Sequence, residues 1–279
     1  MKANLTHFEV KDLQRQIVVL GGSLPRWGVD GCLGDETLRA VAHVLGYDEP
    51  RTELDVSEVD ALNKAFIESI GQFDDHDSVK DARGIAFLKR GKPKKRPIEV
   101  VDTIVLHQMA CMGSTGIQRW LGLDCHWVVT RDTPMAFLLH DVEDLMWHAH
   151  GFNARSVGVE TEGYFSGIET DPKYFWKPEK SKNEPMDFPE HQANAARMAV
   201  IATINIVRQM GGKVLYIGAH RQSYAAKESD PGSLIWKAVG VWAQNEFGLL
   251  EAPTLPAGSP IPEAWDEHHV GVPYRKPKP

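Results

Sequence analysis

Residues 218–232 read GAHRQSYAAKESDPG, and this stretch carries the strongest structural signal in the chain. It begins as the end of a predicted strand, continues as a loop and closes in a turn-forming Pro-Gly pair. The imidazole of His220 and the carboxylate of Asp230 stand ten positions apart. A loop of that length can fold back on itself, so both side chains could reach one metal ion.

A second histidine is needed from the end of another strand, and His107 meets that requirement. It follows the β-branched run from Val100 to Leu106, which predicts a buried strand. Two histidines and one carboxylate leave a fourth zinc position open, which is the catalytic rather than the structural arrangement. A histidine at a strand end is more often a hydrogen-bonded structural residue, so the residues alone leave both interpretations open.

From Glu99 onward the sequence alternates between short apolar runs and longer helical patterns, which is typical of an α/β domain. Arg131 to Pro134 predicts the turn of a hairpin. Pro189 to Met210 predicts a long helix that two glycines end. The elements expected in this region span residues 100–106, 126–130, 135–139, 156–161, 189–210, 214–217 and 233–247.

The first 70 residues predict helices, over residues 10–20, 35–45 and 57–70. Asp35 is expected to cap the second of them, and Gly46 is expected to end it. Residues 71–97 hold an acidic run, a basic run and two prolines, so we interpret them as a linker. The basic run is expected to be a solvated surface segment, with contact to an anionic polymer as the alternative. Residues 251–279 are expected to form a proline-rich, extended tail.

The composition narrows the classes of function for the 279-residue chain. Its net charge of -7 gives no electrostatic reason to expect nucleic acid as a partner. Its three scattered cysteines indicate no disulfide framework and favour a reducing site of synthesis. No apolar run approaches the roughly 20 residues that span a bilayer, so no membrane insertion is expected. The N-terminus lacks the apolar core of a signal peptide, so we expect synthesis in the cytoplasm.

Two further segments carry side chains suited to a site. Trp147 to Asn153 alternates histidines with aromatic residues, which fits either an aromatic core or the wall of a sugar site. Glu160 follows alternating apolar positions and is either paired structurally or a functional acid/base. Glu162 shares its strand face by the two-residue period, so geometry must separate the two.

Taken together and in order, these motifs resemble the type-2 zinc amidases, the N-acetylmuramoyl-L-alanine amidases related in fold to the peptidoglycan recognition proteins. The resemblance covers roughly residues 98 to 248 and implies a central mixed β-sheet flanked by helices. The motifs that carry it are His107 at a strand end, Cys125–Val129, Trp147–Ala149, Gly151–Asn153, Val157–Glu160 and His220–Gly232.

The resemblance implies a mechanism and a role for each residue. Zn2+ would be held by His107, His220 and Asp230, and Glu160 would be the acid/base group. The bond cleaved would be the amide between the lactyl group of N-acetylmuramic acid and L-alanine in peptidoglycan. Lys227 would be the catalytic cation, and the expected substrate-binding residues are Trp147, His148 and Asn153.

Two positions depart from the family pattern. Some members have a tyrosine directly before the histidine of the hairpin strand, where this chain has Cys125. The chain therefore resembles the subgroup that relies on the glutamate. The cation of the family often stands two residues before the last metal ligand, whereas Lys227 stands three before Asp230.

Leu13 to Leu45 resembles the small three-helix peptidoglycan-binding domain, because an Asp-Gly-x-x-Gly turn at Asp30 precedes a helix that contains Thr37. A wall-binding domain and an amidase domain in one chain resemble a wall-lysing phage endolysin, which would be released to the wall during host lysis. We expect the protein to be a monomer. A cytoplasmic enzyme of muropeptide recycling is an alternative. A non-catalytic recognition protein would require a broken metal set. A zinc hydrolase of another wall bond, such as a deacetylase, would release acetate.

Overall fold

The computed structural model describes residues 2–5, 10, 13–14, 17, 20, 22–26, 30–49, 51–71, 79–112, 116–131, 134–167 and 184–266. The chain divides into two compact units. The first comprises Met1–Asp74 with Asn245–Gly248, and the second comprises Asp75–Gln244 with Leu249–Pro279.

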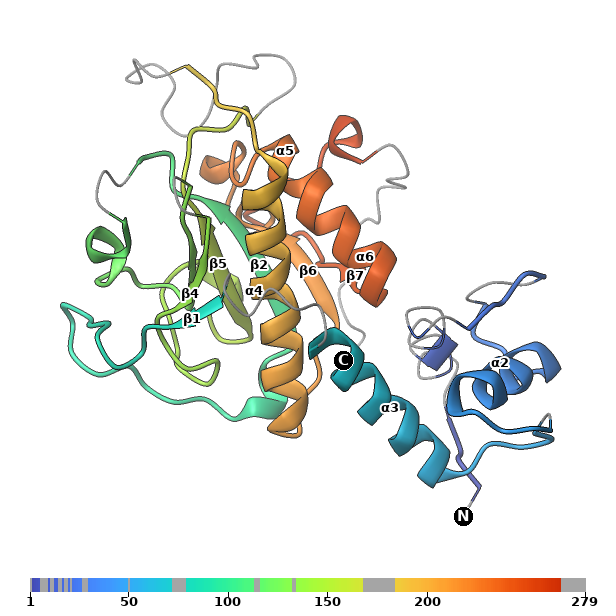
Figure 1. The fold of residues 1–279 in the computed structure, drawn as a ribbon. Helices are drawn as coiled ribbons and strands as arrows, with labels where there is room; N and C mark the ends of the chain where they lie inside the picture. The colour runs from blue at the N-terminus through green and yellow to red at the C-terminus, as the bar shows by residue number, and fades with distance from the viewer. Residues whose placement is uncertain are drawn as a thin grey trace. The chain divides into compact units, whose positions relative to one another are not determined.

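The second unit is an α/β fold built on a seven-stranded sheet (Figure 1). The strand order is β1-β4-β3-β5-β2-β6-β7. All neighbouring pairs are parallel except the β3–β4 hairpin, so the sheet is mixed, as predicted. The strands are β1 (Val79–Asp81), β2 (Thr103–Gln108), β3 (Trp127–Val129), β4 (Ala136–Leu138), β5 (Ser156–Thr161), β6 (Tyr216–Ala219) and β7 (Leu250–Glu251).

A long helix with a buried apolar face packs on the sheet. Figure 1 shows α4 (Glu190–Gln209) lying along the sheet, where it contacts β1, β3, β4 and β5. One face of α4 is buried, including Val200 and Val207. The predicted last helix is one helical run in three parts: α5 (Ser233–Ile235), a π-helical segment (Trp236–Val241) and α6 (Trp242–Phe247).

β2 and β6 begin three and two residues later than predicted, because the hydrogen-bonded ladder decides where pairing starts. Thr103 of β2 pairs with Ser156 of β5 and with Tyr216 of β6. The residues before Thr103 form a 3-10 turn (Ile98–Val100) instead of a strand. The apolar run alone therefore located the strand but not its first residue.

The segment predicted as a linker contributes to the second unit. β1 pairs in parallel with β4 at the edge of the sheet. Arg96 is buried and donates hydrogen bonds to the carbonyl oxygens of Val142 and Ser156. The basic run is partly engaged in surface ion pairs, such as Arg90 with Asp124 at 2.7 Å. β1 has three residues, two of them exposed, so it gives no periodic pattern that sequence analysis could detect.

In the first unit the structure describes α2 (Asp35–Leu45) and α3 (Val56–Gly71), and both were predicted. Gly46 ends α2 with a left-handed backbone (φ 71°), as expected. The N-cap prediction was wrong. Gly34 occupies that position without a side-chain hydrogen bond, and Asp35 is the first helical residue. Most of the predicted helix over residues 10–20 lies outside the described residues, so three helices are not confirmed.

A buried glutamine holds the Asp-Gly turn of this unit. The Nε2 of Gln14 donates to Asp30 Oδ1 at 2.8 Å and to Thr37 Oγ1 at 2.9 Å. Its Oε1 accepts the N–H of Gly31, whose φ of 81° suits glycine. These bonds fix the turn against α2. Asp30, Gly31 and Thr37 must keep their spacing in the sequence for one glutamine to reach all three.

The described part of the proline-rich tail belongs to the second unit and packs within it. Ile261 and Trp265 are buried, and the guanidinium of Arg221 lies 4.7 Å from the Trp265 ring centroid. The N–H groups of Leu255 and Ser259 donate to the carbonyls of Gln222 and Arg221. Residues 252–266 therefore brace the segment that follows β6. The rest of the predicted tail lies outside the described residues.

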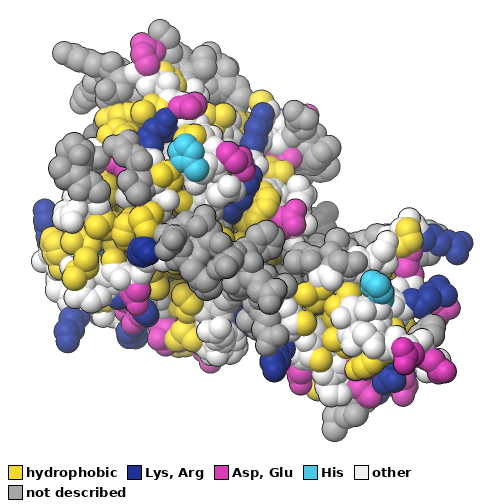
Figure 2. Space-filling view, viewed as in Figure 1, with side chains coloured by type: hydrophobic (Ala, Val, Ile, Leu, Met, Phe, Trp, Pro, Cys, Tyr) yellow, Lys and Arg dark blue, Asp and Glu magenta, His cyan; other side chains and the backbone are white. Residues whose placement is uncertain are grey.

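Among the described residues, no helix is both long and apolar enough to cross a membrane. Figure 2 shows Lys and Arg side chains interspersed with Asp and Glu on the face turned to the viewer.

Candidate metal centre

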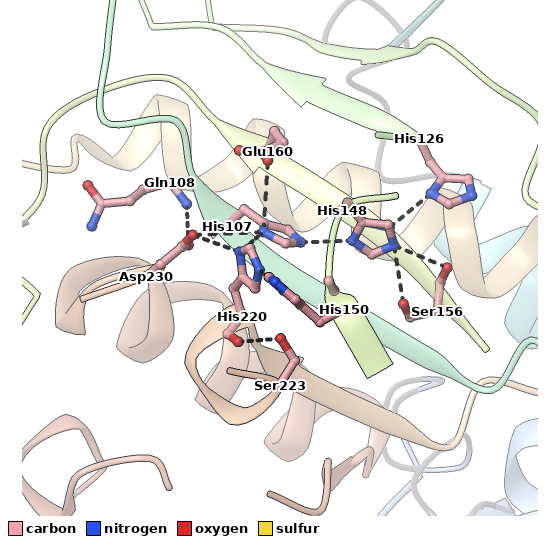
Figure 3. Close-up of polar contacts among 12 residues, drawn as sticks. His107, Gln108, His126, His148, His150, Ser156, Glu160, His220, Ser223 and Asp230 are labelled. Carbon is pink, nitrogen blue, oxygen red and sulfur yellow. Dashed lines mark hydrogen bonds and ion pairs between the residues drawn. The ribbon is translucent and has the colours of Figure 1, made fainter. Parts of the chain in front are cut away.

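Three parallel strands deliver the candidate site to one edge of the sheet. His107 of β2 lies directly opposite Glu160 of β5 in the parallel ladder, so both side chains leave neighbouring strands on the same face. His220 directly follows the end of β6, the other neighbour of β2. Sites in parallel sheets form at such carboxyl ends. Figure 3 shows these side chains converging from the three strands.

The structure brings His107, His220 and Asp230 together as a buried group that could hold a metal ion. His220 Nδ1 lies 3.0 Å from His107 Nδ1 and 2.9 Å from Asp230 Oδ2. The third distance, from His107 Nδ1 to Asp230 Oδ2, is 4.0 Å. Ligand atoms in a tetrahedral zinc site with bonds of about 2.0–2.1 Å lie about 3.3 Å apart. The three distances bracket that value, so the group fits the metal that the sequence predicts.

Burial keeps the imidazole of His107 neutral, as a metal ligand must be. Its side chain is fully enclosed, and burial together with the neighbouring His220 holds the pKa of His107 well below its usual range. A neutral imidazole keeps a lone pair, which metal coordination requires. The lowered pKa therefore leaves His107 neutral and able to act as a ligand.

Gln108 positions Asp230 and was not identified from the sequence. Its backbone N–H donates to Asp230 Oδ1 at 2.9 Å, which leaves Oδ2 to face the histidines. Its side-chain Nε2 donates to the carbonyl of Ser229 at 2.6 Å, and its Oε1 accepts the N–H of Phe165. A polar residue at the end of a wholly buried strand was the available signal.

Glu160 lies beside this group, where its carboxyl group could exchange protons with a bound water or substrate. Its Oε1 is 3.8 Å from His107 Nδ1, and its side chain is 20% exposed. Burial raises the pKa of Glu160 to about 8, with a further rise from the charge of Asp230 and an opposing effect of Lys227. A carboxyl group with a pKa near neutrality can both accept and donate a proton at working pH.

Geometry separates Glu162 from Glu160, as the sequence alone could not. Glu162 is buried, and its Oε2 accepts the backbone N–H of Arg131 at 3.0 Å. Its carbonyl accepts the Nε2 of Gln192 at 2.7 Å. Glu162 therefore ties β5 to the hairpin and to α4, while Glu160 faces the candidate metal group.

A cavity of about 680 Å³ opens beside the group. Trp147, with 64% of its surface exposed, and Lys227 both line it. His148 and Asn153 also border it, but both are buried and their polar atoms bind other parts of the chain. Asn153 Oδ1 accepts the backbone N–H groups of His148 at 3.0 Å and Ala149 at 2.6 Å. Six of the eight predicted site residues line this cavity, and Trp147 is the most accessible of the six; His107 and Asp230 do not line it.

Residues 95–233 match the family model described as N-acetylmuramoyl-L-alanine amidase (Amidase_2). This segment is similar to the type-2 amidase domain. Every residue of the candidate metal group lies inside the matched range of this domain. The N-terminal unit lies outside that range.

Solved structures similar to the type-2 amidase domain include amidases and recognition proteins. N-acetylmuramoyl-L-alanine amidase LysC from Clostridium intestinale URNW is 14% identical, covering 59% of this chain and 98% of its own, with a TM-score of 0.40. The Ph2119 endolysin from the Thermus scotoductus MAT2119 bacteriophage is 18% identical, covering 60% and 98%, with a TM-score of 0.36. Bumblebee PGRP-SA is 14% identical, covering 63% and 98%, with a TM-score of 0.41. No curated protein matches the sequence.

Proposed function

We propose that the protein is a zinc-dependent N-acetylmuramoyl-L-alanine amidase that cleaves the amide between N-acetylmuramic acid and L-alanine in peptidoglycan. The observation that carries this proposal is the complete His107, His220 and Asp230 group inside a type-2 amidase domain. A glutamate with a raised pKa lies beside that group, and the adjoining cavity has room for a sugar and a peptide.

The residues divide the work of hydrolysis between them. When bound, zinc supplies Lewis acidity, which polarises the scissile carbonyl and makes water a better nucleophile. Glu160 takes a proton from the attacking water and later passes one to the leaving amine. The raised pKa of Glu160 favours the second of these transfers, the donation of a proton to the amine.

Lys227 and Trp147 complete the proposed site. The ammonium of Lys227 lies near enough to Glu160 to lower the pKa of that carboxyl group. We assign Lys227 to stabilising the negative charge that develops on the carbonyl oxygen, because a cation beside the reacting carbonyl serves that purpose. The exposed indole of Trp147 offers an apolar face for a pyranose ring at the rim of the cavity.

A non-catalytic peptidoglycan-recognition protein is the second candidate, since recognition proteins share this domain type. The intact metal-binding group favours the enzyme, because recognition alone does not need buried metal ligands beside an acid/base carboxyl group. A deacetylase would use similar chemistry on a different bond, so the products must decide.

Digestion of purified peptidoglycan by the full-length protein tests the activity. An amidase releases new amino-terminal alanine, which end-group labelling detects. Free acetate without new alanine would identify a deacetylase, and tight wall binding without any product would identify a recognition protein. Either of these two results would overturn the proposal.

We further propose that the first unit binds the wall and that the enzyme acts as an endolysin. The network around the Asp-Gly turn supports this assignment, because it preserves the local motif shared with peptidoglycan-binding domains. The protein would be made in the cytoplasm and reach the wall during host lysis. A protein made inside the host should therefore lyse the cells only after their membrane is permeabilised.

A further inference from the structure

The segment Trp147–Asn153 contacts both candidate histidine ligands from behind. His148 Nδ1 lies 2.9 Å from His107 Nε2, the ring nitrogen that points away from the metal group. His150 Nδ1 lies 3.5 Å from the corresponding nitrogen of His220. One short segment therefore meets the outer nitrogen of each ligand, and Figure 3 shows both contacts.

The hydrogen bonds behind His148 decide which ring nitrogen carries each proton. His148 Nε2 lies 3.4 Å from the carbonyl of Ser156 and 3.2 Å from its Oγ. The Ser156 hydroxyl donates its own proton to the carbonyl of Phe152 at 2.8 Å. Carbonyl oxygens accept and never donate, so His148 Nε2 must be the donor here.

The position of the proton on His148 in turn decides the position of the proton on His107, the candidate metal ligand. With its proton on Nε2, a neutral His148 has a lone pair on Nδ1 and accepts from His107 Nε2. His107 then carries its proton on Nε2 and presents an unprotonated Nδ1 to His220 and Asp230. Backbone carbonyls of β5 and the preceding turn thus select the tautomer of His107 that can bind a metal.

The segment is itself held in place. Asn153 Oδ1 accepts the backbone N–H groups of His148 and Ala149, which closes a tight loop. His150 adopts a positive φ of 47°, a conformation that few L-residues adopt. Its ring stacks on Tyr224, with centroids 4.6 Å apart and planes at 25°. A non-glycine residue kept in this conformation points to a use for its side chain.

We propose that Trp147–Asn153 is a clamp that orients both histidine ligands of the metal site, with His148 as the principal positioning residue and His150 as the weaker one. The proposal rests on the zinc site of the proposed function but not on the reaction catalysed there. Outer partners of this kind fix the tautomer and ring orientation of metal-bound histidines, and their loss lowers metal affinity by about 10- to 100-fold.

Zinc affinity of the full-length protein, measured by competition with a chromogenic chelator, tests the clamp. His148→Leu should weaken zinc binding by about 10- to 100-fold. His148→Asn should recover part of this loss, because its side-chain oxygen replaces Nδ1 as an acceptor. His140→Leu is the matched control, since it removes a buried imidazole that lies against the Leu123 carbonyl instead of a metal ligand. Equal zinc affinity in His148→Leu and His140→Leu would overturn the proposal.

His150→Gly separates positioning from structural support. Glycine suits the positive φ, which offsets the lost stacking on Tyr224, so thermal stability should change little. Zinc affinity should fall by a few-fold, less than for His148→Leu, because a 3.5 Å contact is weaker than a 2.9 Å contact. Unchanged zinc affinity in this variant would remove His150 from the clamp.

Nuclear magnetic resonance of the zinc-free, ¹⁵N-labelled protein reads the proton directly. A scalar coupling across the hydrogen bond should join His107 Nε2 to His148 Nδ1, with the proton attached to His107. A proton attached to His148 Nδ1, or no coupling, would contradict the proposal. Because neither readout requires hydrolysis, a protein that binds zinc but cleaves no amide would disprove the proposed function and leave the clamp intact.

Discussion

Two glutamates, one in β5 and one just after it, illustrate how position decides role at the residue scale. Glu160 lies opposite His107 in the ladder and faces the candidate metal group, whereas Glu162 accepts hydrogen bonds that tie three elements together. Sequence periodicity assigned both to the same face. Only the neighbouring β3–β4 hairpin and α4 show that Glu162 is engaged elsewhere.

Glu160→Gln should keep the fold and the zinc but lower turnover by about 10²-fold or more, because glutamine cannot exchange protons with water and the leaving amine. Turnover on a soluble muropeptide, with zinc content measured in the same sample, checks this. Glu162→Gln is the matched comparison and should retain more activity. The reverse order of the two variants would transfer the acid/base role to Glu162.

Glu251 makes stability depend on pH. Its Oε1 accepts the Nε2 of Gln222, and burial together with the nearby Asp266 raises the pKa of Glu251 to about 7. The unfolded chain releases this proton near its ordinary value of 4.5, while the folded chain retains it to about 7. Stability from this group is therefore full below about pH 4.5 and is lost as the pH rises to about 7.

Glu251→Gln should remove that dependence. The difference in unfolding free energy between variant and wild type should grow in favour of the variant from pH 4.5 to 7, by up to about 3 kcal/mol. Urea unfolding at several pH values measures it. A difference that stays constant across this range would show that the carboxyl group titrates normally in the folded protein.

At the scale of elements, the sequence predicted most of the strands and helices of the second unit. β5, α4 and the β3–β4 hairpin were predicted because each has strong local periodicity or a clear turn. β1 was missed because its three residues acquire their structure from pairing with β4. The first residue of β2 likewise depends on its partners, so local pattern could not supply it.

Sequence analysis also missed the C-terminal brace, because prolines indicate only an extended chain. Residues 252–266 pair with the segment after β6, and Arg221 links the two through its backbone and side chain. The N–H of Arg221 also donates to the carbonyl of Asp230 at 3.0 Å. Arg221 therefore connects the brace to both candidate metal ligands, because it follows His220 in the sequence and binds the backbone of Asp230.

Trp265→Ala should destabilise the second unit by about 3–5 kcal/mol, the usual cost of removing a buried tryptophan. Zinc affinity should fall as well, since the loop from His220 to Asp230 loses its support. Urea unfolding and chelator competition measure the two effects. Trp265→Phe keeps an aromatic ring beneath Arg221 and should lose less of both. Wild-type stability in the alanine variant would show that the brace contributes nothing.

At the scale of the whole molecule, the candidate site was predictable because parallel strands bring distant residues to one edge. His107, Glu160 and His220 come from three separate regions of the sequence, and the resemblance to one family connected them. The hydrogen-bond partners behind them were not predictable. Gln108 and His150 act through contacts that only the folded chain defines.

Deletion of residues 1–74 should separate wall binding from hydrolysis. The shortened protein should lose binding to insoluble peptidoglycan yet hydrolyse a soluble muropeptide at close to the full-length rate. Linking a binding unit to an enzyme raises its effective concentration on a polymer without altering the chemistry. A sedimentation assay and a muropeptide assay measure the two properties. Loss of both activities would make the first unit a structural part of the amidase.

The central claim is that His107, His220 and Asp230 hold one zinc ion on which hydrolysis depends. Its most direct test is zinc content and amidase activity measured together during chelation and zinc re-addition. The wild type should bind one zinc per chain, lose activity as zinc is removed and regain it on re-addition. His107→Ala and Asp230→Ala should bind less zinc and release correspondingly little alanine. Full release of alanine from peptidoglycan by a zinc-free sample would contradict the claim.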